Sequence, residues 1–292
     1  MNADTSQLRH GYAQIEDGIK LHYVQQGDGP LALLLHGFPE FWYSWRHQIP
    51  FLAGKFKAVA PDLRGYNLSD KPRGVASYFV EKLTDDVRSL IRVLGAEKAI
   101  VVGHDWGGII AWYLAAYHPE AVERLVVLNA PHPRAYLREM PRNFRQLRAS
   151  WYVFMFQLPW LPEWYVRRER YLMLRKALRG WAHRKEAFSD EDLRLFEEAM
   201  SQPGCLTAAI NYYRGLFRDR ATLKRIRQFP TIAVPTLIIW AEDDRALTKD
   251  LTYGLDPYFA EPPRIRYIPR CSHWVQQEQP DQVNRYLEEF LF

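Results

Sequence analysis

Short apolar runs alternate with helix-like stretches along most of this 292-residue chain, and this alternation restricts the fold more than any other feature. The runs are rich in Val, Ile and Leu and nearly continuous, as is typical of strands buried on both faces of a parallel sheet. They cover residues 31–37, 56–62, 98–105, 124–131, 235–244 and 264–273, with helical spacing in intervals such as 78–94 and 107–117. We therefore predict an α/β fold with a mostly parallel, twisted sheet flanked by helices.

The alternation of strand-like and helix-like segments stops in residues 132–225. Aromatic and Arg-rich segments with helical spacing replace the strand-like runs, and Pro141, Pro159, Pro162 and Pro203 separate them. A chain of this length also approaches the size at which single cores stop growing. We predict a core domain made of residues 1–131 and 226–292, and an inserted, all-helical cap domain made of residues 132–225.

The strongest local motif is Gly103-His104-Asp105-Trp106-Gly107-Gly108, which joins an apolar run to a helical pattern. Glycines around a central residue fit a nucleophile elbow, because this strand-to-helix turn is tight and leaves no room for side chains. An Asp that only caps the following helix is the simpler alternative. Three glycines at these positions favour the elbow, with Asp105 as nucleophile.

A carboxylate at the nucleophile position restricts the reactions that such a site can catalyse. Aspartate is ionised at neutral pH, so Asp105 would attack an electrophilic carbon without first losing a proton to a base. Attack on an epoxide or an alkyl halide would form an ester on Asp105 itself. Water would then attack the ester carbonyl, and only this second step needs a base.

His36-Gly37-Phe38-Pro39 ends the run at 31–35, where a loop amide would face the elbow. An oxyanion hole needs two such donors, and we assign them to the backbone amides of Phe38 and Trp106. The ring of Trp106 would lie beside the substrate. Without the elbow, the same four residues would indicate only a turn that ends a strand.

The base and the acid are expected at the same edge of the sheet. His273 follows the last run, and the chain order nucleophile, acid, histidine is that of α/β-hydrolases. Asp244, at the end of the run before it, is our choice for the acid that orients the imidazole. Asp243 remains an alternative on spacing, and the other possible acid position carries the uncharged Asn129.

Charge and cysteine content exclude several other classes. The net charge is +5, and residues 131–185 hold thirteen Arg or Lys against three Glu. No basic recognition motif accompanies this excess, so we expect outer faces of amphipathic helices and no nucleic-acid partner. Two cysteines, Cys205 and Cys271, are too few for a disulfide framework or a metal cluster. We expect no cofactor, no metal site, no membrane anchor and a cytoplasmic location, and the sequence does not predict the oligomeric state.

Together these motifs resemble the α/β-hydrolase-fold epoxide hydrolases, including the catalytic domain of vertebrate soluble epoxide hydrolase. The similarity covers nearly the whole chain and is strongest in HGFPEFWYSWRHQIP (36–50), GHDWGG (103–108), AEDD (241–244) and CSHW (271–274). It implies Asp105 as nucleophile, Asp244 as acid and His273 as base. An apolar epoxide and water are then the expected substrates.

The family also uses two cap tyrosines that bind the epoxide oxygen and protonate it as the ring opens. The resemblance assigns these roles to Tyr152, in the pattern Tyr-x-x-x-Phe-Gln-x-Pro, and to Tyr213, in Asn-x-Tyr-Arg. Tyr212 is an alternative to Tyr213 because it is the next residue. Substrate would contact Phe38, Trp106, Tyr152 and Tyr213, and we expect the cavity to be shaped further by Trp151, Phe154, Phe156, Trp160 and Leu216.

Two other functions are alternatives to epoxide hydrolysis. Haloalkane and haloacid dehalogenases share the fold, the Asp nucleophile and the His base, but the former usually have Asn where this chain has Phe38. Fluoroacetate-type relatives have Arg after the nucleophile, where this chain has Trp106. A silent ligand-binding protein on the same scaffold would normally lack a triad member, and none is lacking here.

Overall fold

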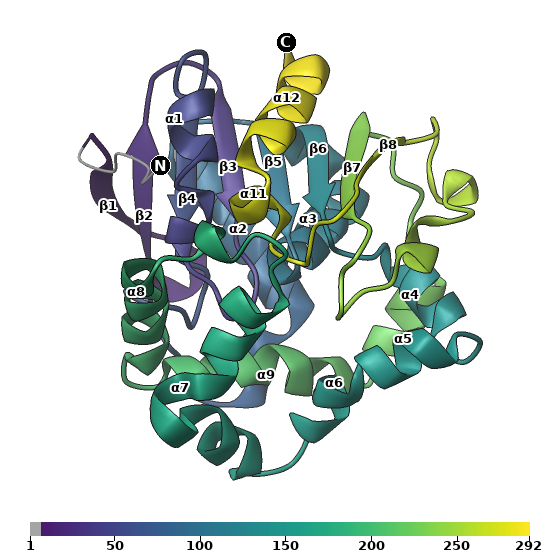
Figure 1. Cartoon of the computed structure of the whole chain (residues 1–292). Helices are drawn as coiled ribbons and strands as arrows, with labels where there is room; N and C mark the ends of the chain where they lie inside the picture. Colours follow the sequence, from purple (N-terminus) through teal and green to yellow (C-terminus); the bar gives the residue numbers. More distant parts are fainter. Residues whose placement is uncertain (1–6) are drawn as a thin grey trace.

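An eight-stranded sheet runs through the middle of the molecule (Figure 1). The structure is a computed structural model that describes residues 7–292. The strand order is β1-β2-β4-β3-β5-β6-β7-β8; β2 pairs antiparallel with both β1 and β4, and the other pairs are parallel. The strands are β1 (Arg9–Gln14), β2 (Lys20–Gln26), β3 (Leu31–Leu35), β4 (Lys57–Pro61), β5 (Ala99–His104), β6 (Val122–Leu128), β7 (Thr236–Ala241) and β8 (Arg264–Ile268).

The prediction of a mostly parallel sheet is confirmed, and each of the six apolar runs contains a strand. The apolar runs did not predict β1 and β2. These strands lie at the antiparallel edge of the sheet, and β1 is exposed along most of its length. Because one face of such a strand meets water, its sequence alternates and includes polar residues, so it lacks the continuous apolar signal of a central strand.

Helices cover both faces of the sheet, since neighbouring residues of a strand point in opposite directions. Leu31, Leu33 and Leu35 of β3 pack toward α2 (Val80–Val93) and α3 (Trp106–Tyr117). Ala32 and Leu34 pack on the other face, toward α1 (Gln48–Leu52) and α12 (Pro280–Leu291), which follows the short α11 (Val275–Glu278). The sheet is therefore the shared wall of two hydrophobic cores.

Only helices form between β6 and β7, and they gather at one end of the sheet (Figure 1). They are α4 (Pro133–Glu139), α5 (Phe144–Ala149), α6 (Trp151–Met155), α7 (Leu161–Trp181), α8 (Asp190–Ser201), α9 (Cys205–Arg218) and α10 (Thr222–Arg227). Left-handed residues at 169–171 break α7 in its middle. This helical insertion is near the carboxyl ends of the parallel strands, where the chain leaves β5 at the predicted elbow.

A buried ion pair fastens the insertion to the core. Arg46, just after the short 3-10 helix η2 (Trp42–Trp45), lies 3.6 Å from Asp192 of α8. The Tyr43 hydroxyl also donates to Asp192, at 2.9 Å. Arg46 is almost fully buried, so this contact is part of a packed interface.

Two further observations concern the described residues as a whole. None of the helices in residues 7–292 is both long and apolar enough to cross a bilayer. Cys205 and Cys271 are both free thiols and both buried.

Candidate active site

Asp105 is the single residue between the end of β5 and the start of α3, and its backbone is strained. Its φ of 49° and ψ of −119° lie outside the regions that residues with a Cβ normally adopt. The Asp105 amide donates to the Leu128 carbonyl at 3.3 Å, and the Asp105 carbonyl accepts from the Ile109 amide at 2.9 Å. A Cβ on Gly107 would lie 2.1 Å from the Leu35 carbonyl oxygen, so glycine is required there for close approach.

The two carboxylate oxygens of Asp105 have different neighbours. Oδ1 accepts a hydrogen bond from the Phe38 amide at 2.8 Å. Oδ2 lies 3.6 Å from Nε2 of His273. Gly37 lets the carboxylate lie this close to the β3 loop, because a Cβ there would be 2.6 Å from Oδ1. The Trp106 amide has no hydrogen-bond acceptor within residues 7–292, which leaves it available to a second oxyanion contact.

The His273 ring is held on its far side by Asp244. Nδ1 of His273 is 2.6 Å from Oδ2 of Asp244, and both side chains are buried. The other Asp244 oxygen accepts the Ala246 and Leu247 amides at 2.7 and 3.0 Å. Asp243, the alternative acid, instead lies 3.2 Å from His183 and is half-exposed.

Charge coupling sets the ionisation of this pair. Burial alone would lower the pKa of His273, but Asp244 and Asp105 together raise it to about 10. Burial would raise the pKa of Asp244, but the His273 charge and hydrogen bonds, including one from Asn129, hold it below its usual value. Before reaction, His273 is therefore a cation between two carboxylates at neutral pH.

Two buried residues behind His273 were not assigned from the sequence. Nδ1 of His104 is 2.8 Å from Glu40 Oε2, and Nε2 of His104 donates to the His273 carbonyl at 2.8 Å. Burial would raise the pKa of Glu40, but the charge of His104 and several hydrogen bonds lower it to about 2. Both residues lie inside the quoted motifs HGFPE and GHDWGG, so the signal was present in the sequence.

Asn129 was also overlooked as a contact of the acid. Its side-chain amide donates to Asp244 Oδ2 at 2.7 Å, and its carbonyl oxygen accepts the Ala241 amide at 3.0 Å. This residue follows β6, at the position where the sequence analysis considered and rejected another acid. It connects β6 to the acid loop after β7.

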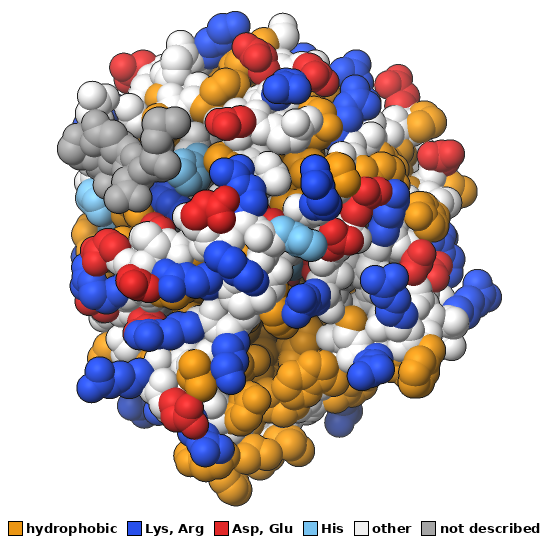
Figure 2. Space-filling model, viewed as in Figure 1, with side chains coloured by type: hydrophobic (Ala, Val, Ile, Leu, Met, Phe, Trp, Pro, Cys, Tyr) orange, Lys and Arg blue, Asp and Glu red, His pale blue; other side chains and the backbone are white. Residues whose placement is uncertain are grey.

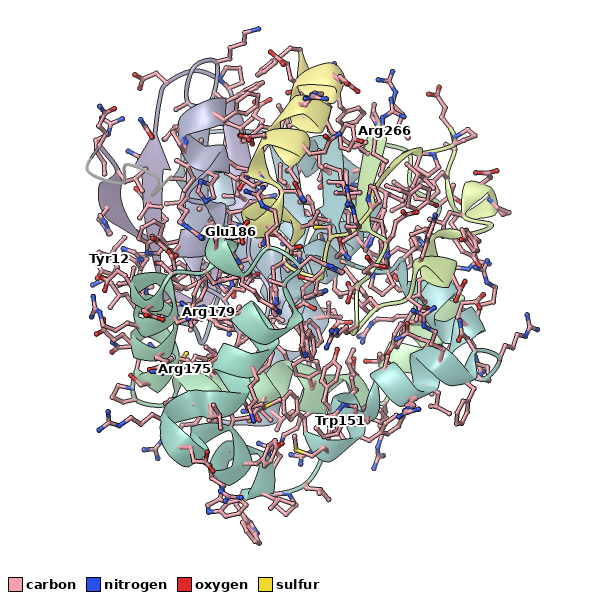
Figure 3. The ribbon with its side chains drawn as sticks, in the orientation of Figure 1. Tyr12, Trp151, Arg175, Arg179, Glu186 and Arg266 are labelled. Carbon is pink, nitrogen blue, oxygen red and sulfur yellow. The ribbon has the colours of Figure 1, made fainter. Side chains whose placement is uncertain are left out.

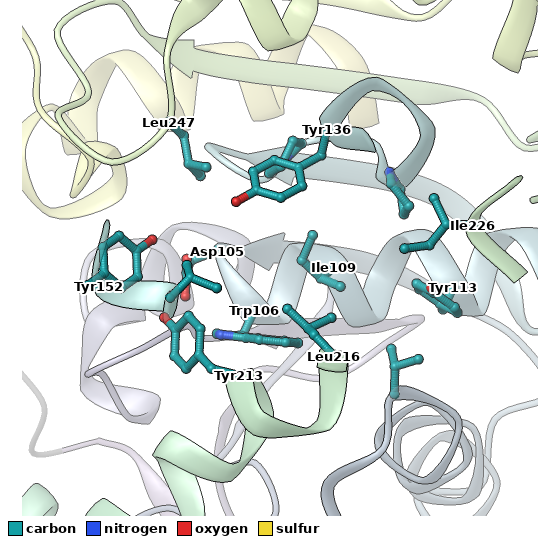
Figure 4. Close-up of a pocket in the computed structure, with 14 residues that line it drawn as sticks. Asp105, Trp106, Ile109, Tyr113, Tyr136, Tyr152, Tyr213, Leu216, Ile226 and Leu247 are labelled. Atoms are coloured by element: carbon teal, nitrogen blue, oxygen red, sulfur yellow. The ribbon is translucent and has the colours of Figure 1, made fainter. Parts of the chain in front are cut away.

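Two tyrosines of the helical insertion point their hydroxyls toward Asp105 (Figure 4). They are Tyr152 on α6 and Tyr213 on α9, whose ring centroids are 5.8 Å apart. Burial, with the nearby Asp105 charge, raises the pKa of both phenols well above the usual value, so both keep their protons. The neighbouring Tyr212 points elsewhere, because its hydroxyl donates to the Arg64 carbonyl at 2.6 Å.

Comparisons with known proteins agree with this arrangement. The model of the alpha/beta hydrolase fold family matches residues 30–280. Epoxide hydrolase 3 of Xenopus tropicalis is 40% identical over 97% of this chain and 78% of its own length. The crystal structure of a Bacillus megaterium epoxide hydrolase with an inhibitor superposes with a TM-score of 0.88, at 33% identity, over 96% of this chain and 99% of that one.

This chain belongs to the epoxide hydrolase family of α/β-hydrolase-fold enzymes. A Bacillus subtilis relative, AB hydrolase superfamily protein YfhM, is 42% identical over 94% of this chain and 95% of its own length, and its name specifies no substrate. Within residues 7–292, no group of three or more His, Cys, Asp or Glu side chains is arranged to hold a metal ion.

Two apolar chambers of this hydrolase meet at Asp105. Asp105, Tyr152 and Tyr213 border both chambers. The larger chamber, of about 100 Å³, extends along Ile109 and Tyr113 of α3 toward Leu216 and Ile226 (Figure 4). The smaller chamber, of about 60 Å³, contains His273 and is bordered by Phe38, Trp151, Met173, Trp181 and Trp274.

The predicted cavity lining was only partly right. Trp151 and Leu216 do border the chambers. Phe156 is fully buried behind Phe38 and Tyr213, with ring centroids 5.5 and 5.0 Å away. Phe154 and Trp160 are wrong, because their rings are 46% and 72% exposed on the outside of the insertion. An apolar residue of a helical insertion lines the cavity only if it lies on the inner face of its helix. The spacing of apolar residues alone did not predict which face points inward.

Proposed function

We propose that this enzyme converts apolar epoxides and water into vicinal diols through a covalent ester on Asp105. The observation that carries the proposal is the position of one carboxylate between a loop amide, a histidine and two protonated phenols. In the first step, Oδ2 of Asp105 attacks an epoxide carbon and the carbon–oxygen bond of the ring breaks. The alkoxide takes a proton from Tyr152 or Tyr213, while the other phenol donates a hydrogen bond.

Before the second step, the proton that His273 carries in the resting enzyme passes through solvent to the phenolate left by the first step. The neutral His273 then removes a proton from water, and the resulting hydroxide attacks Cγ of Asp105. The negative charge develops on Oδ1, which the Phe38 amide already holds, and the Trp106 amide is our candidate for the second donor. The bond between Cγ and the diol oxygen then breaks. The diol takes the proton that His273 removed from water, and the carboxyl proton that the hydroxide brought to Asp105 passes to His273, so that the resting charges of both residues are restored.

Ester formation itself helps His273 to act as the base. The carboxylate of Asp105 is one of the charges that raise the pKa of His273, and it becomes neutral when the ester forms. Loss of this charge lowers the pKa of the imidazole at the moment when it must give up its proton. Asp244 remains charged and keeps Nδ1 in place.

We also propose that residues 132–225 act as a cap domain on a core made of residues 1–131 and 226–292. The cap would supply both tyrosines and cover the chambers. Its last helix, α10, ends at Arg227, two residues beyond the boundary expected from the sequence. The cytoplasmic location of the enzyme stays a prediction from sequence.

The adduct formed by the variant His273→Gln tests the mechanism. This variant should still attack an epoxide but fail to activate water, so intact-protein mass spectrometry should show a stable gain equal to the epoxide mass. Peptide mapping should place that gain on Asp105. His183→Gln is the matched control, because His183 pairs with Asp243 outside the proposed triad and should turn over normally.

Multiple turnovers by His273→Gln, or a bound epoxide that never forms an adduct, would contradict the assignment. Parallel reactions with an alkyl bromide of matched shape separate the proposed activity from dehalogenation. We expect the epoxide to react faster, because Tyr152 and Tyr213 give the leaving alkoxide a proton that a departing halide does not need.

A further inference from the structure

The outer surface of the helical insertion carries exposed apolar side chains that the proposed reaction does not use. We call this cluster the apolar tip, and it consists of Phe154, Leu158, Trp160, Trp164, Tyr165 and Phe217, each more than two-fifths exposed. Figure 2 shows hydrophobic side chains gathered at the end of the molecule formed by the insertion. Exposed patches of this kind usually mark a surface that binds a partner or a membrane.

The backbone behind the apolar tip is fixed from inside. The buried Arg214 side chain of α9 donates to the carbonyls of Phe156 and Leu158 at 3.1 and 2.8 Å, and it pairs with Glu163 at 2.7 Å. Trp160 occupies the left-handed region with a φ of 50°, which is unusual for a bulky residue. The loop between α6 and α7 is therefore anchored, and its apolar side chains project outward from a defined base.

Two arginines lie beside two of these apolar side chains. Arg167 and Arg168 border the same surface hollow as Trp160 and Trp164, and the Arg168 guanidinium lies 4.8 Å from the centre of the Trp164 ring. Residues 131–185 contain only three acidic side chains against thirteen basic ones. Each of the three already faces an arginine: Glu139 faces Arg138, Glu163 faces Arg214, and Glu169 faces Arg168. Arg175, Arg179 and Arg184 pair with Glu197, Asp190 and Glu186, which lie outside the segment. The other eight basic side chains of the segment, Arg167 among them, form no salt bridge within the described residues.

We propose that the apolar tip docks the enzyme on the surface of anionic phospholipid membranes. Trp and Tyr rings favour the boundary between lipid headgroups and acyl chains, and nearby arginines are attracted to anionic lipid. A projecting ring such as Trp160 needs a matching pocket in a folded protein partner, whereas a fluid bilayer adapts to it. This inference concerns surface binding only and does not depend on the proposed reaction.

The tip is also close in the chain to a residue that lines the smaller chamber. Trp151 borders the smaller chamber, and it stands on α6 three residues before Phe154 of the tip. Its side chain is 52% exposed and lies on the insertion away from α8 (Figure 3). An apolar epoxide dissolved in the bilayer would thus be close to the chamber while the tip is docked.

Vesicle co-sedimentation of the full chain without substrate tests this proposal. We expect binding to vesicles that contain phosphatidylserine, and much weaker binding to phosphatidylcholine alone. The variant Trp160→Asn/Trp164→Gln should lose most of this binding, and Asn tolerates the left-handed backbone at position 160. Phe292→Ser is the matched control, because this ring is 48% exposed at the chain end far from the insertion (Figure 1).

A second pair of variants tests the charge. Arg167→Gln/Arg168→Gln should lower the partition onto anionic vesicles roughly tenfold or more, since each basic residue near the surface contributes to it. Arg92→Gln/Lys98→Gln removes the same charge from exposed side chains of the core and should bind like the unaltered enzyme.

Equal binding to neutral and anionic vesicles, no binding to either, or unchanged binding by the tip variant would overturn the proposal. A dimer that disappears in the tip variant, measured by light scattering without vesicles, would show instead that the tip binds a second copy. The tip variants should hydrolyse an epoxide dissolved in water at the normal rate. Loss of hydrolysis and loss of membrane binding are therefore measured separately.

Discussion

At the scale of single residues, Tyr212 and Tyr213, which are neighbours on α9, have different surroundings. Both rings pack against Trp106, at 5.2 Å for Tyr213 and 5.3 Å for Tyr212, but Tyr213 alone of the two borders the chambers. Tyr212 is bonded to the Arg64 carbonyl and packs against Tyr66 and Tyr78. One step along the helix thus separates a residue that we propose contacts substrate from one that holds the insertion to the core.

Tyrosine substitutions should separate these roles. Tyr152→Phe and Tyr213→Phe each remove a hydrogen bond that strengthens as alkoxide charge develops, so ester formation should slow roughly 10- to 1000-fold. Tyr212→Phe should leave this step nearly unchanged and cost about 1 kcal/mol of stability. Single-turnover kinetics and urea unfolding measure the two effects, and a large kinetic loss in Tyr212→Phe would reverse our assignment.

The charge on His273 should also appear in the pH dependence of stability. Its pKa is raised from 6.5 to about 10 by Asp244 and Asp105 against the effect of burial, so the folded state binds the proton more tightly than the unfolded state. This stabilisation is complete below about pH 6.5 and is lost as pH rises through the folded pKa, at up to about 1.4 kcal/mol per pH unit.

Urea unfolding of the wild type and of His273→Gln between pH 6 and pH 10 provides the measurement. The free energy of unfolding should fall with pH more steeply in the wild type than in the variant. Parallel curves over this range would show that His273 is not a cation in the resting enzyme.

At the scale of elements, the elbow depends on glycines that allow β3, β5 and α3 to approach closely. In Gly107→Ala the new methyl group would lie 2.1 Å from the Leu35 carbonyl oxygen, a backbone atom that cannot move alone. We expect a loss of about 3 kcal/mol or more in the free energy of unfolding, or failure to fold. In α7, Gly180→Ala places its methyl group 3.7 Å from the nearest side chain, so it should stabilise by about 0.5–1 kcal/mol. Thermal unfolding of both variants checks this contrast, and similar effects at the two positions would contradict it.

The same scale shows what the sequence could and could not predict. The elbow and the six central strands are local patterns, in which the glycines around Asp105 and the apolar runs carry the information. The roles of Glu40 and Asn129 arise from hydrogen bonds to residues far away in the chain, His104 and Asp244. The outward rotation of Trp160 likewise follows from the contacts of Arg214 with the α6–α7 loop, which no spacing rule contains.

At the scale of the whole molecule, the insertion is held to the core through Asp192. Burial would raise the pKa of this carboxyl, but the Arg46 charge and hydrogen bonds with Ser189 and Tyr43 lower it. Asp192→Asn would leave the buried Arg46 guanidinium without its carboxylate and should cost roughly 3 kcal/mol.

Hydrogen exchange should show where this stability is lost. We expect faster exchange in α7 and α8 of Asp192→Asn, with the central strands less affected. Glu191→Gln is the matched control, because Glu191 is exposed and, within residues 7–292, forms its salt bridge with Arg194 of the same helix. Uniform acceleration across the sheet and the insertion would show instead that they unfold as one unit.

The asymmetry between the two oxygens of Asp105 has a consequence for isotope exchange. Oδ1 is held by the Phe38 amide, so Oδ2 would leave with each diol and be replaced by an oxygen from water. In oxygen-18 water the first diol should be unlabelled, and later diols should carry one heavy atom. After many turnovers the Asp105 peptide should gain one heavy oxygen. If the carboxylate rotates between cycles, Oδ1 would also attack an epoxide and be replaced by an oxygen from water. The fraction of doubly labelled peptide would therefore count how often that rotation occurs.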